Sequence, residues 1–271
     1  MNILLLEPAE RELSSRDPRA RHIRKVLHAH AGDDLRAGEI GGALGVATIV
    51  SESAGGYVLE FKPAHAPPPL PPVELLLGHP RPIVLKRLLR DLAALGPSAV
   101  IVAPTELGEK SYYESSLWSD VRTPLLEGAA QSGTTLVPEV ARVASLSDAI
   151  GRLRSASDGR LVLHGESVAP ASPSGTRPAG ARSRETPQGR RGLPPRGIFE
   201  SLAALGAGRV PGDESWLTVA VGSERGWTAR EIALLGNAGF VPCTLGSRVL
   251  RTETAATIAV WAAVSWYDGR A

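Results

Sequence analysis

Three short segments of this 271-residue sequence combine glycine with charged or hydroxyl side chains, as ligand-binding and catalytic sites often do. They are residues 164–166, 221–227 and 244–255, and each directly follows a run that we predict to be a strand. Glycines there expose backbone N–H and C=O groups to a ligand, and Arg251 and Glu253 open a predicted helix. Because open α/β sheets bind ligands beyond the carboxyl ends of their strands, we predict that the three segments form one site.

Several other kinds of site are excluded by the sequence. It has no G-x-x-x-x-G-K-[ST] phosphate loop and no G-x-S-x-G nucleophile elbow, and the glycines at 206 and 208 do not fit a dinucleotide loop. The single cysteine, Cys243, rules out an intrachain disulfide framework and a multi-cysteine zinc site. Since the six histidines show no metal-ligand spacing backed by carboxylates, we expect no metal.

The elements that must position the three segments form an α/β pattern. From residue 73 onward, short apolar runs alternate with amphipathic segments, which predicts a mostly parallel sheet with helices on both faces. The expected strands are 73–77, 99–102, 140–142, 161–164, 216–221 and 240–244. The expected helices are 82–95, 119–132, 146–154, 228–237, with a capping box between Thr228 and Glu231, and about 252–267.

A second unit precedes this sheet. Residues 1–65 read as a small β-rich domain with strands at 2–6, 34–37, 45–50 and 57–62 and one helix at 19–30, capped by Asp17. Residues 66–72 then form a proline-rich linker, which is a stiff connector typical of a domain boundary. We therefore divide the chain into domains at 1–65 and 73–271.

The net charge is only +2, but basic residues gather in two places. Residues 11–28 carry six basic and two acidic side chains, and residues 167–197 carry six arginines and one glutamate. The second stretch has almost no large apolar residue, so we predict a disordered insertion that contributes affinity for phosphates. Both patches are compatible with an anionic polymer as substrate. A solvated basic face would also explain the first, and a neutral surface insertion, tolerated because a longer loop costs little closure entropy, would explain the second.

From composition and apolar patterning we expect a cytoplasmic protein. The chain is 43% hydrophobic and 21% charged, so it can bury a sizeable core. The N-terminus has an apolar run of only five residues without a basic region before it, unlike a signal peptide. The longest apolar stretch, 255–266, is too short to cross a bilayer, so we expect no membrane association.

Three sequence motifs resemble one protein family. The run LGSRVLRTETA at 245–255 closely resembles the C-terminal signature of the RsmE family of 16S rRNA uridine-N3 methyltransferases, which belong to the SPOUT superfamily. The run VGSERGWTAREI at 221–232, with Gly239 and Phe240, is similar to that family's glycine loop, helix and strand. HIRKVLHAHAGDDLRAG at 22–38 is similar to a motif of its PUA-like barrel, and the resemblance covers most of the chain outside about 167–215.

This resemblance implies a sheet closed by a deep trefoil knot behind a PUA-like β-barrel, a homodimer, S-adenosylmethionine as cofactor and 16S rRNA of the small ribosomal subunit as substrate. It places the cofactor against His164, Gly165, Glu166, Val221, Gly222, Glu224, Gly226, Thr244, Leu245, Gly246, Val249 and Leu250. It places RNA against Arg19, Arg21, His22, Arg24, Lys25 and Arg225. Arg251 would stabilise the uridine anion or bind phosphate, and Glu253 with Thr254 would position the base or remove its proton.

Departures from the family pattern keep two alternatives open: an RNA-binding protein of the same fold without catalysis, and a methyltransferase acting on another RNA. In the glycine loop, Ser223 replaces a common proline and Arg225 replaces a glycine, so a cation stands beside the cofactor or turns outward to phosphate. The family's glutamate-glutamine pair appears as Ala130-Gln131, an arginine as Thr134 and another as His28. Arg251 and Glu253 could also be a simple ion pair at the start of a helix.

Overall fold

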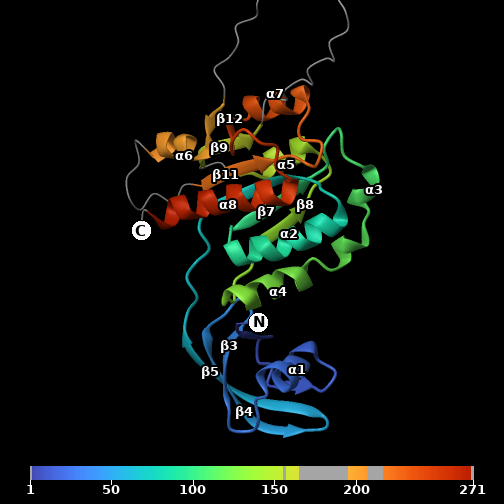
Figure 1. Cartoon of the computed structure of the whole chain (residues 1–271), viewed down its shortest axis with the longest axis vertical. Helices are drawn as coiled ribbons and strands as arrows, with labels where there is room; N and C mark the ends of the chain where they lie inside the picture. Colours follow the sequence, from blue (N-terminus) through green and yellow to red (C-terminus); the bar gives the residue numbers. More distant parts are fainter. Residues whose placement is uncertain (1, 155–156, 165–194, 207–215, 270–271) are drawn as a thin grey trace, which may run out of the picture.

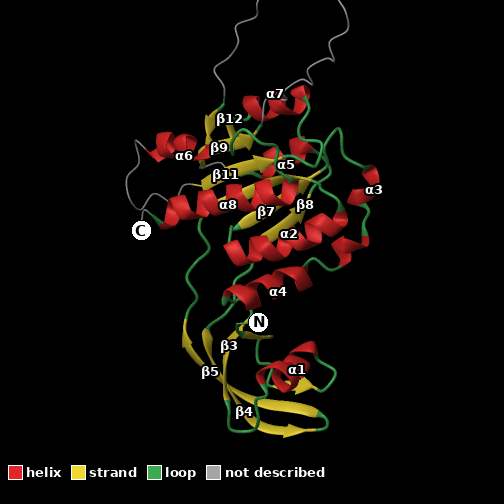
Figure 2. Ribbon diagram, viewed as in Figure 1, coloured by secondary structure: helices red, strands yellow, loops and turns green. Residues whose placement is uncertain are grey.

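Two sheets, each with its own buried core, make up the protein (Figure 1, Figure 2). The computed structural model describes residues 2–154, 157–164, 195–206 and 216–269. The segment 66–72 joins the two sheets and contains no helix or strand. Most of the predicted insertion, residues 165–194, lies outside the described residues.

The larger sheet has seven strands, and every strand pair in it is parallel. Its order is β10-β12-β9-β11-β6-β7-β8, so strands distant in the sequence lie side by side. This confirms the predicted parallel sheet, whose continuous apolar runs suit strands buried on both faces. The strands are β6 (Val73–Gly78), β7 (Ala99–Ala103), β8 (Glu139–Arg142), β9 (Ser157–Leu163), β10 (Arg196–Gly197), β11 (Trp216–Val221) and β12 (Phe240–Thr244).

Helices cover both faces of this sheet, as predicted (Figure 1). On one face, α2 (Pro82–Leu95), α6 (Ile198–Gly206) and α8 (Thr252–Asp268) pack on the larger core, and α4 (Arg122–Ser132) lies beside α2. On the other face, α5 (Leu146–Arg152) and α7 (Ala229–Asn237) cover a second apolar cluster. The predicted capping box forms at the start of α7, where Thr228 and Glu231 bond each other's backbone N–H groups.

The N-terminal sheet is a curled half-barrel of five strands in the order β1-β3-β4-β5-β2, all antiparallel except the β1–β3 pair. The strands are β1 (Leu4–Leu6), β2 (Glu12–Ser14), β3 (Asp34–Glu39), β4 (Leu44–Ser53) and β5 (Gly56–His65). The sequence did not predict β2, because its three residues include one apolar side chain. Among the described residues, β1 and β2 do not pair, so the predicted barrel is open between them.

The helix predicted at 19–30 is wrong in its second half. Asp17 caps α1 (Pro18–His22) as predicted, but a π-helical turn at Ile23–Leu27 follows. The chain leaves this turn at His28, which has a left-handed φ of 52°. Ile23 and Ala29 are both buried in the same cluster, and a continuous helix would place residues six positions apart on different sides.

Other boundaries also differ from prediction. The helix expected from residue 119 begins at Arg122, because Ser116–Ser119 form a 3₁₀ turn that ends at the extended residue Asp120. The insertion ends earlier than predicted, since Arg196 and Gly197 pair with β12. The sequence did not predict α6 or the four-residue helix α3 (Lys110–Tyr113). The trefoil knot stays a prediction, because the links from β9 to β10 and from α6 to β11 leave the described residues.

Hydrogen bonds join the N-terminal part of the chain to α4 and the loop that follows it. The Ala130 carbonyl, in α4, accepts from the N–H groups of Asn2 (2.9 Å) and Ile3 (3.1 Å). Thr135 Oγ1 donates to the Gly42 carbonyl (2.6 Å), and Ile3 packs in an apolar cluster with Ala130. The position where the family carries a polar pair is therefore part of the contact between the sheets in this chain. None of the helices in the described ranges has the length and apolar character needed to span a bilayer.

Candidate functional site

The structure brings the three predicted segments to one edge of the parallel sheet. They follow β9, β11 and β12, and β9 pairs directly with both of the other strands. Because all three strands run in the same direction, their carboxyl ends meet there. The His164 N–H donates to the Cys243 carbonyl (3.1 Å), which ties the first segment to β12 directly before the third. Gly165 and Glu166 lie outside the described residues.

The loop after β11 is a tight turn that glycine makes possible. The Gly226 N–H donates to the Ser223 carbonyl (2.8 Å), and Gly226 has a φ of +70°. A Cβ at Gly222 would lie 2.8 Å from the Gly226 Cα, a distance that real Cβ atoms essentially never show. Val221 and Gly222 are buried, whereas Glu224 is exposed and accepts from the Arg81 N–H (2.9 Å) at the start of α2.

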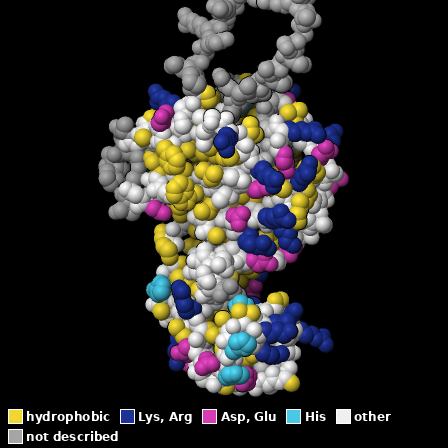
Figure 3. All heavy atoms as spheres, viewed as in Figure 1, with side chains coloured by type: hydrophobic (Ala, Val, Ile, Leu, Met, Phe, Trp, Pro, Cys, Tyr) yellow, Lys and Arg dark blue, Asp and Glu magenta, His cyan; other side chains and the backbone are white. Residues whose placement is uncertain are grey.

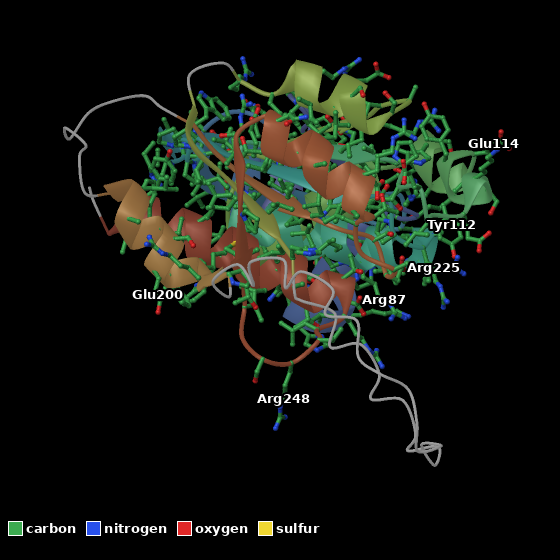
Figure 4. All side chains as sticks on the ribbon, turned by 90° about the horizontal axis from the view of Figure 1, so that it is seen from above. Arg87, Tyr112, Glu114, Glu200, Arg225 and Arg248 are labelled. Atoms are coloured by element: carbon green, nitrogen blue, oxygen red, sulfur yellow. The ribbon has the colours of Figure 1, made fainter. Side chains whose placement is uncertain are left out.

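Arg225 turns away from this loop (Figure 4). Its guanidinium donates to the Leu107 carbonyl (3.3 Å) and lies 3.7 Å from a carboxylate oxygen of Glu109. The side chain is 65% exposed, so it is open to an anion from solvent. Of the two positions that the sequence allowed for this cation, the structure shows the outward one.

The loop after β12 projects from the sheet. Thr244 Oγ1 donates to the Gly246 carbonyl (2.8 Å), and Gly246 has a φ of +130°. Leu245 packs on the larger core, while Val249 is fully exposed and Arg248 points outward (Figure 4). A Cβ at Gly226 or Gly246 would meet no atom within 4 Å, so the backbone at both positions faces open space where a ligand can approach.

Arg251, Glu253 and Thr254 lie at the start of α8. Arg251 is the N-cap residue and is exposed, Glu253 is half-buried in the first turn, and Thr254 is exposed. Within the described part of the chain, neither Arg251 nor Glu253 makes a side-chain hydrogen bond or ion pair. The simple ion pair between them is therefore not observed, and both side chains can act on a ligand.

A histidine that the sequence analysis did not select lies at the same edge. His79 follows β6 and is 3% exposed, and burial lowers its pKa. Trp118 Nε1 donates to His79 Nε2 (3.1 Å), so the neutral ring carries its proton on Nδ1 and donates it to the Pro80 carbonyl (2.8 Å). β6 pairs with β11, so the strand-end rule applied to β6 could have indicated this histidine.

The described residues at this site provide neither a reactive thiol nor a cluster of metal ligands. Cys243 is fully buried, and burial raises the pKa of its thiol to about 12, which keeps it protonated and unreactive. Across the described ranges, no group of three or more histidine, cysteine, aspartate or glutamate side chains could hold a metal ion.

The residues predicted to bind RNA in the N-terminal domain divide into two groups. Arg19 uses all its N–H donors internally, on the Leu5 carbonyl and the carboxylates of Glu10 and Asp17. In this structure its guanidinium is therefore committed to bonds within the domain. Arg21, Arg24 and Lys25 are exposed, and basic side chains gather over α1 (Figure 3), whereas His22 is half-buried.

Known proteins resemble this chain along most of its length. Residues 67–181 and 198–264 match the RNA methyltransferase domain family. Ribosomal RNA small subunit methyltransferase E of Treponema pallidum is 35% identical to this chain, in an alignment that covers 96% of this chain and 89% of that protein. Ribosomal RNA small subunit methyltransferase E 1 of Borreliella burgdorferi is 24% identical and covers 94% of each chain. The crystal structure of a ribosomal RNA small subunit methyltransferase E from Neisseria gonorrhoeae, bound to S-adenosyl methionine, has a TM-score of 0.67 at 20% identity, over 98% of this chain and 97% of that one.

The close approach at Gly222 leads to a testable difference between two glycines. Gly222→Ala is expected to lower the free energy of unfolding by about 1–3 kcal/mol, because the new methyl group must displace backbone atoms. Gly236→Ala, in α7, is the matched control, since a Cβ there meets nothing within 4 Å and alanine favours the helix by about 0.5–1 kcal/mol. Urea unfolding followed by circular dichroism measures both, and equal effects would contradict the observed packing of the turn.

Proposed function

Because the chain belongs to the RsmE family of ribosomal RNA small subunit methyltransferases, we propose that it methylates N3 of a uridine in 16S rRNA with S-adenosylmethionine. The observation that carries this proposal is the meeting of the three glycine-containing segments at one sheet edge, beside Arg251 and Glu253. The family supplies the reaction class, and the uridine N3 target rests on the resemblance of residues 245–255 to the family signature.

The residues at this edge fit the cofactor. Gly226 and Gly246 face open space and have positive φ values, so their backbone groups are accessible to adenine and ribose without a side chain in the way. We propose that the cofactor lies against His164, Gly165, Glu166, Val221, Gly222, Glu224, Gly226, Thr244, Leu245, Gly246, Val249 and Leu250. When bound, it supplies the methyl group from its sulfonium centre.

The residues at the start of α8 suit the uridine. The uridine imide is a weak acid, so N3 must lose its proton before or while it attacks the methyl group. We propose that Glu253 accepts this proton and that Thr254 helps to orient the base. The Arg251 guanidinium then stabilises the negative charge that develops on the uridine or binds its phosphate. No metal is needed for these roles.

Arg251 gives the test of this function. Arg251→Ala is expected to slow methylation at least about 100-fold, because removing a group that stabilises transition-state charge costs that much. Its affinity for S-adenosylmethionine should remain within about two-fold of wild type, measured by calorimetry. Arg152→Ala is the control, since Arg152 is an exposed arginine at the end of α5, on the opposite edge of the sheet.

Mass spectrometry of rRNA nucleosides tests the product in cells. A deletion strain should lose 3-methyluridine from 16S rRNA, and the wild-type gene should restore it while the Arg251→Ala gene should not. Unchanged 3-methyluridine in the deletion strain would refute the proposed reaction. Assays of the purified enzyme on 30S subunits, 50S subunits and tRNA then show which RNA it accepts.

We propose that Arg21, Arg24 and Lys25 bind rRNA phosphates together with Arg225. The exposed π-helical turn presents Arg24 and Lys25, and Arg225 lies near the proposed cofactor loops. Such contacts position the RNA and make its binding sensitive to salt. His22 is half-buried, with no hydrogen-bond partner for its buried Nε2 in the described structure, so it contributes less to this surface than the exposed Arg21, Arg24 and Lys25.

The contrast between Arg19 and its neighbours gives a second test. The double variant Arg24→Ala/Lys25→Ala should weaken rRNA binding and lower the slope of log affinity against log salt by about one to two, with unchanged stability. Arg19→Ala should instead lower the free energy of unfolding by about 1–3 kcal/mol, because it leaves the carboxylates of Glu10 and Asp17 unpaired. Filter binding at several salt concentrations and urea unfolding separate the two. The reverse pattern would contradict this division.

We propose that the protein is a homodimer through α6 and α8. Phe199 and Trp261 are 59% and 50% exposed, and their rings meet edge to face at 6.2 Å. Hydrophobic side chains gather over these two helices (Figure 3), and a contiguous exposed apolar patch is typical of a protein interface. A second copy suits it, because the family resemblance implies a homodimer and because the first turn of α8, capped by Arg251, carries Glu253 of the proposed site.

Light scattering tests the dimer. Wild type should have the mass of two chains, and Trp261→Arg should have the mass of one, because a buried unpaired charge disfavours the contact. Val50→Arg is the control, since Val50 is 55% exposed on β4 of the other sheet and should leave the mass unchanged. A wild-type protein that is monomeric at micromolar concentration would contradict the proposal.

A further inference from the structure

We propose that Thr105, in the loop after β7, is a positioning residue that holds the glycine loop 222–226 in its cofactor-binding conformation. The proposal rests on the proposed function, because that function places S-adenosylmethionine against this loop. Thr105 acts through Ser223 rather than through contact with the cofactor.

The contact itself is a buried hydrogen bond between hydroxyl groups. Thr105 Oγ1 and Ser223 Oγ lie 3.0 Å apart, and one hydroxyl donates to the other. Thr105 is 7% exposed and Ser223 is 6% exposed, so water does not replace either partner readily. Losing one partner of a buried pair leaves the other unsatisfied, which costs more than an exposed hydrogen bond is worth. The bond therefore restrains Ser223, the first residue of the turn.

A glycine in the intervening strand makes this contact possible. β6 lies between β11 and β7, so Thr105 must reach Ser223 across the end of β6. The residue there is Gly78, where a Cβ would lie 2.6 Å from the Ser223 nitrogen and 2.7 Å from the Thr105 Cγ2. Any larger residue would separate the two loops. The ends of three adjacent strands thus pack directly on one another.

The loop that carries Thr105 is itself held in place. The Glu106 N–H donates to Glu231 Oε1 (2.8 Å), and Thr228 Oγ1 donates to Glu106 Oε2 (2.7 Å). Thr228 and Glu231 form the capping box of α7, so the loop is anchored on a helix terminus. A restraint needs a rigid support, and these bonds provide it.

Ser223 is also where this chain departs from its family, which commonly has proline there. Proline restrains its own backbone through its ring, whereas serine leaves φ free. The hydroxyl bond to Thr105 provides a restraint of a different kind at the same position. The loop thus depends on a residue 118 positions earlier in the chain.

Calorimetric titration of the full-length chain with S-adenosylmethionine tests the proposal. Thr105→Val and Ser223→Ala should each raise the dissociation constant about ten-fold, since a disordered loop must be reordered on binding. Thr105→Ser keeps the hydroxyl and should restore affinity to within about two-fold of wild type. The double variant should bind no more weakly than either single variant, because both remove the same bond. KM for S-adenosylmethionine should rise while kcat at saturation stays near that of wild type.

Thr218→Val is the matched control. Thr218 is a fully buried threonine on β11, whose hydroxyl donates to Glu74 Oε2 (3.2 Å), far along the strand from the glycine loop. It should lose a buried hydrogen bond without changing cofactor affinity. Equal weakening by Thr105→Val and Thr218→Val would overturn the proposal, because general destabilisation would then explain both. Additive effects in the double variant would also overturn it.

The proposal and the proposed function fail in different ways. A wild-type chain that binds no S-adenosylmethionine would overturn the proposed function and the cofactor role of Thr105 with it. Normal binding by wild type together with normal binding by Thr105→Val would overturn the positioning role alone. Hydrogen exchange of the cofactor-free protein measures the restraint on the loop directly. The amides of residues 222–226 should exchange faster in Thr105→Val than in wild type or Thr218→Val.

Discussion

Parallel pairing of β9, β11 and β12 is the constraint on which the site depends. Parallel strands place all their carboxyl ends at one edge, so segments that are far apart in the sequence meet there. The same geometry brings the ends of β6 and β7 to this edge, and with them Gly78, His79 and Thr105. An antiparallel strand in the middle of the sheet would send one of these segments to the opposite edge.

Close packing at glycine residues shapes the loops at this edge, together with the carboxylates of Glu106, Glu224 and Glu231 that accept from backbone and side-chain groups. Gly78 and Gly222 allow backbone atoms to approach at distances that a Cβ would prevent, whereas Gly226 and Gly246 face open space. The first pair lets the loops support one another, and the second pair leaves backbone groups available to a ligand. The cations, Arg225 and Arg248, lie outside this arrangement and point toward solvent (Figure 4).

The sequence predicted the elements with strong local patterns. β11 and β12 and the amphipathic helix α2 have the predicted limits, because continuous apolar runs and a helical apolar face are local properties. The site segments followed from the strand-end rule. Thr105, by contrast, could not be linked to Ser223, since nothing in the sequence shows which strands become neighbours. The internal bonds of Arg19 could not be predicted for a similar reason, because Leu5 and Glu10 lie 14 and 9 residues earlier in the chain and the sequence does not show that the fold brings them to it.

Hydrogen bonds and apolar packing join the N-terminal part of the chain, which carries the proposed RNA-binding turn, to the part that carries the proposed active site. Asn2 and Ile3 donate to the Ala130 carbonyl in α4, and the Thr135 hydroxyl donates to the Gly42 carbonyl in the turn between β3 and β4. Apolar burial of Ile3 against Ala130 excludes water from these bonds and strengthens them. The part of the chain with the basic turn near Arg24 is therefore attached to the part with Arg251 by these contacts as well as through the segment 66–72. With RNA bound at both proposed surfaces, the RNA must match their arrangement, so the proposed function predicts that target choice depends on the shape of the folded RNA as well as on its sequence.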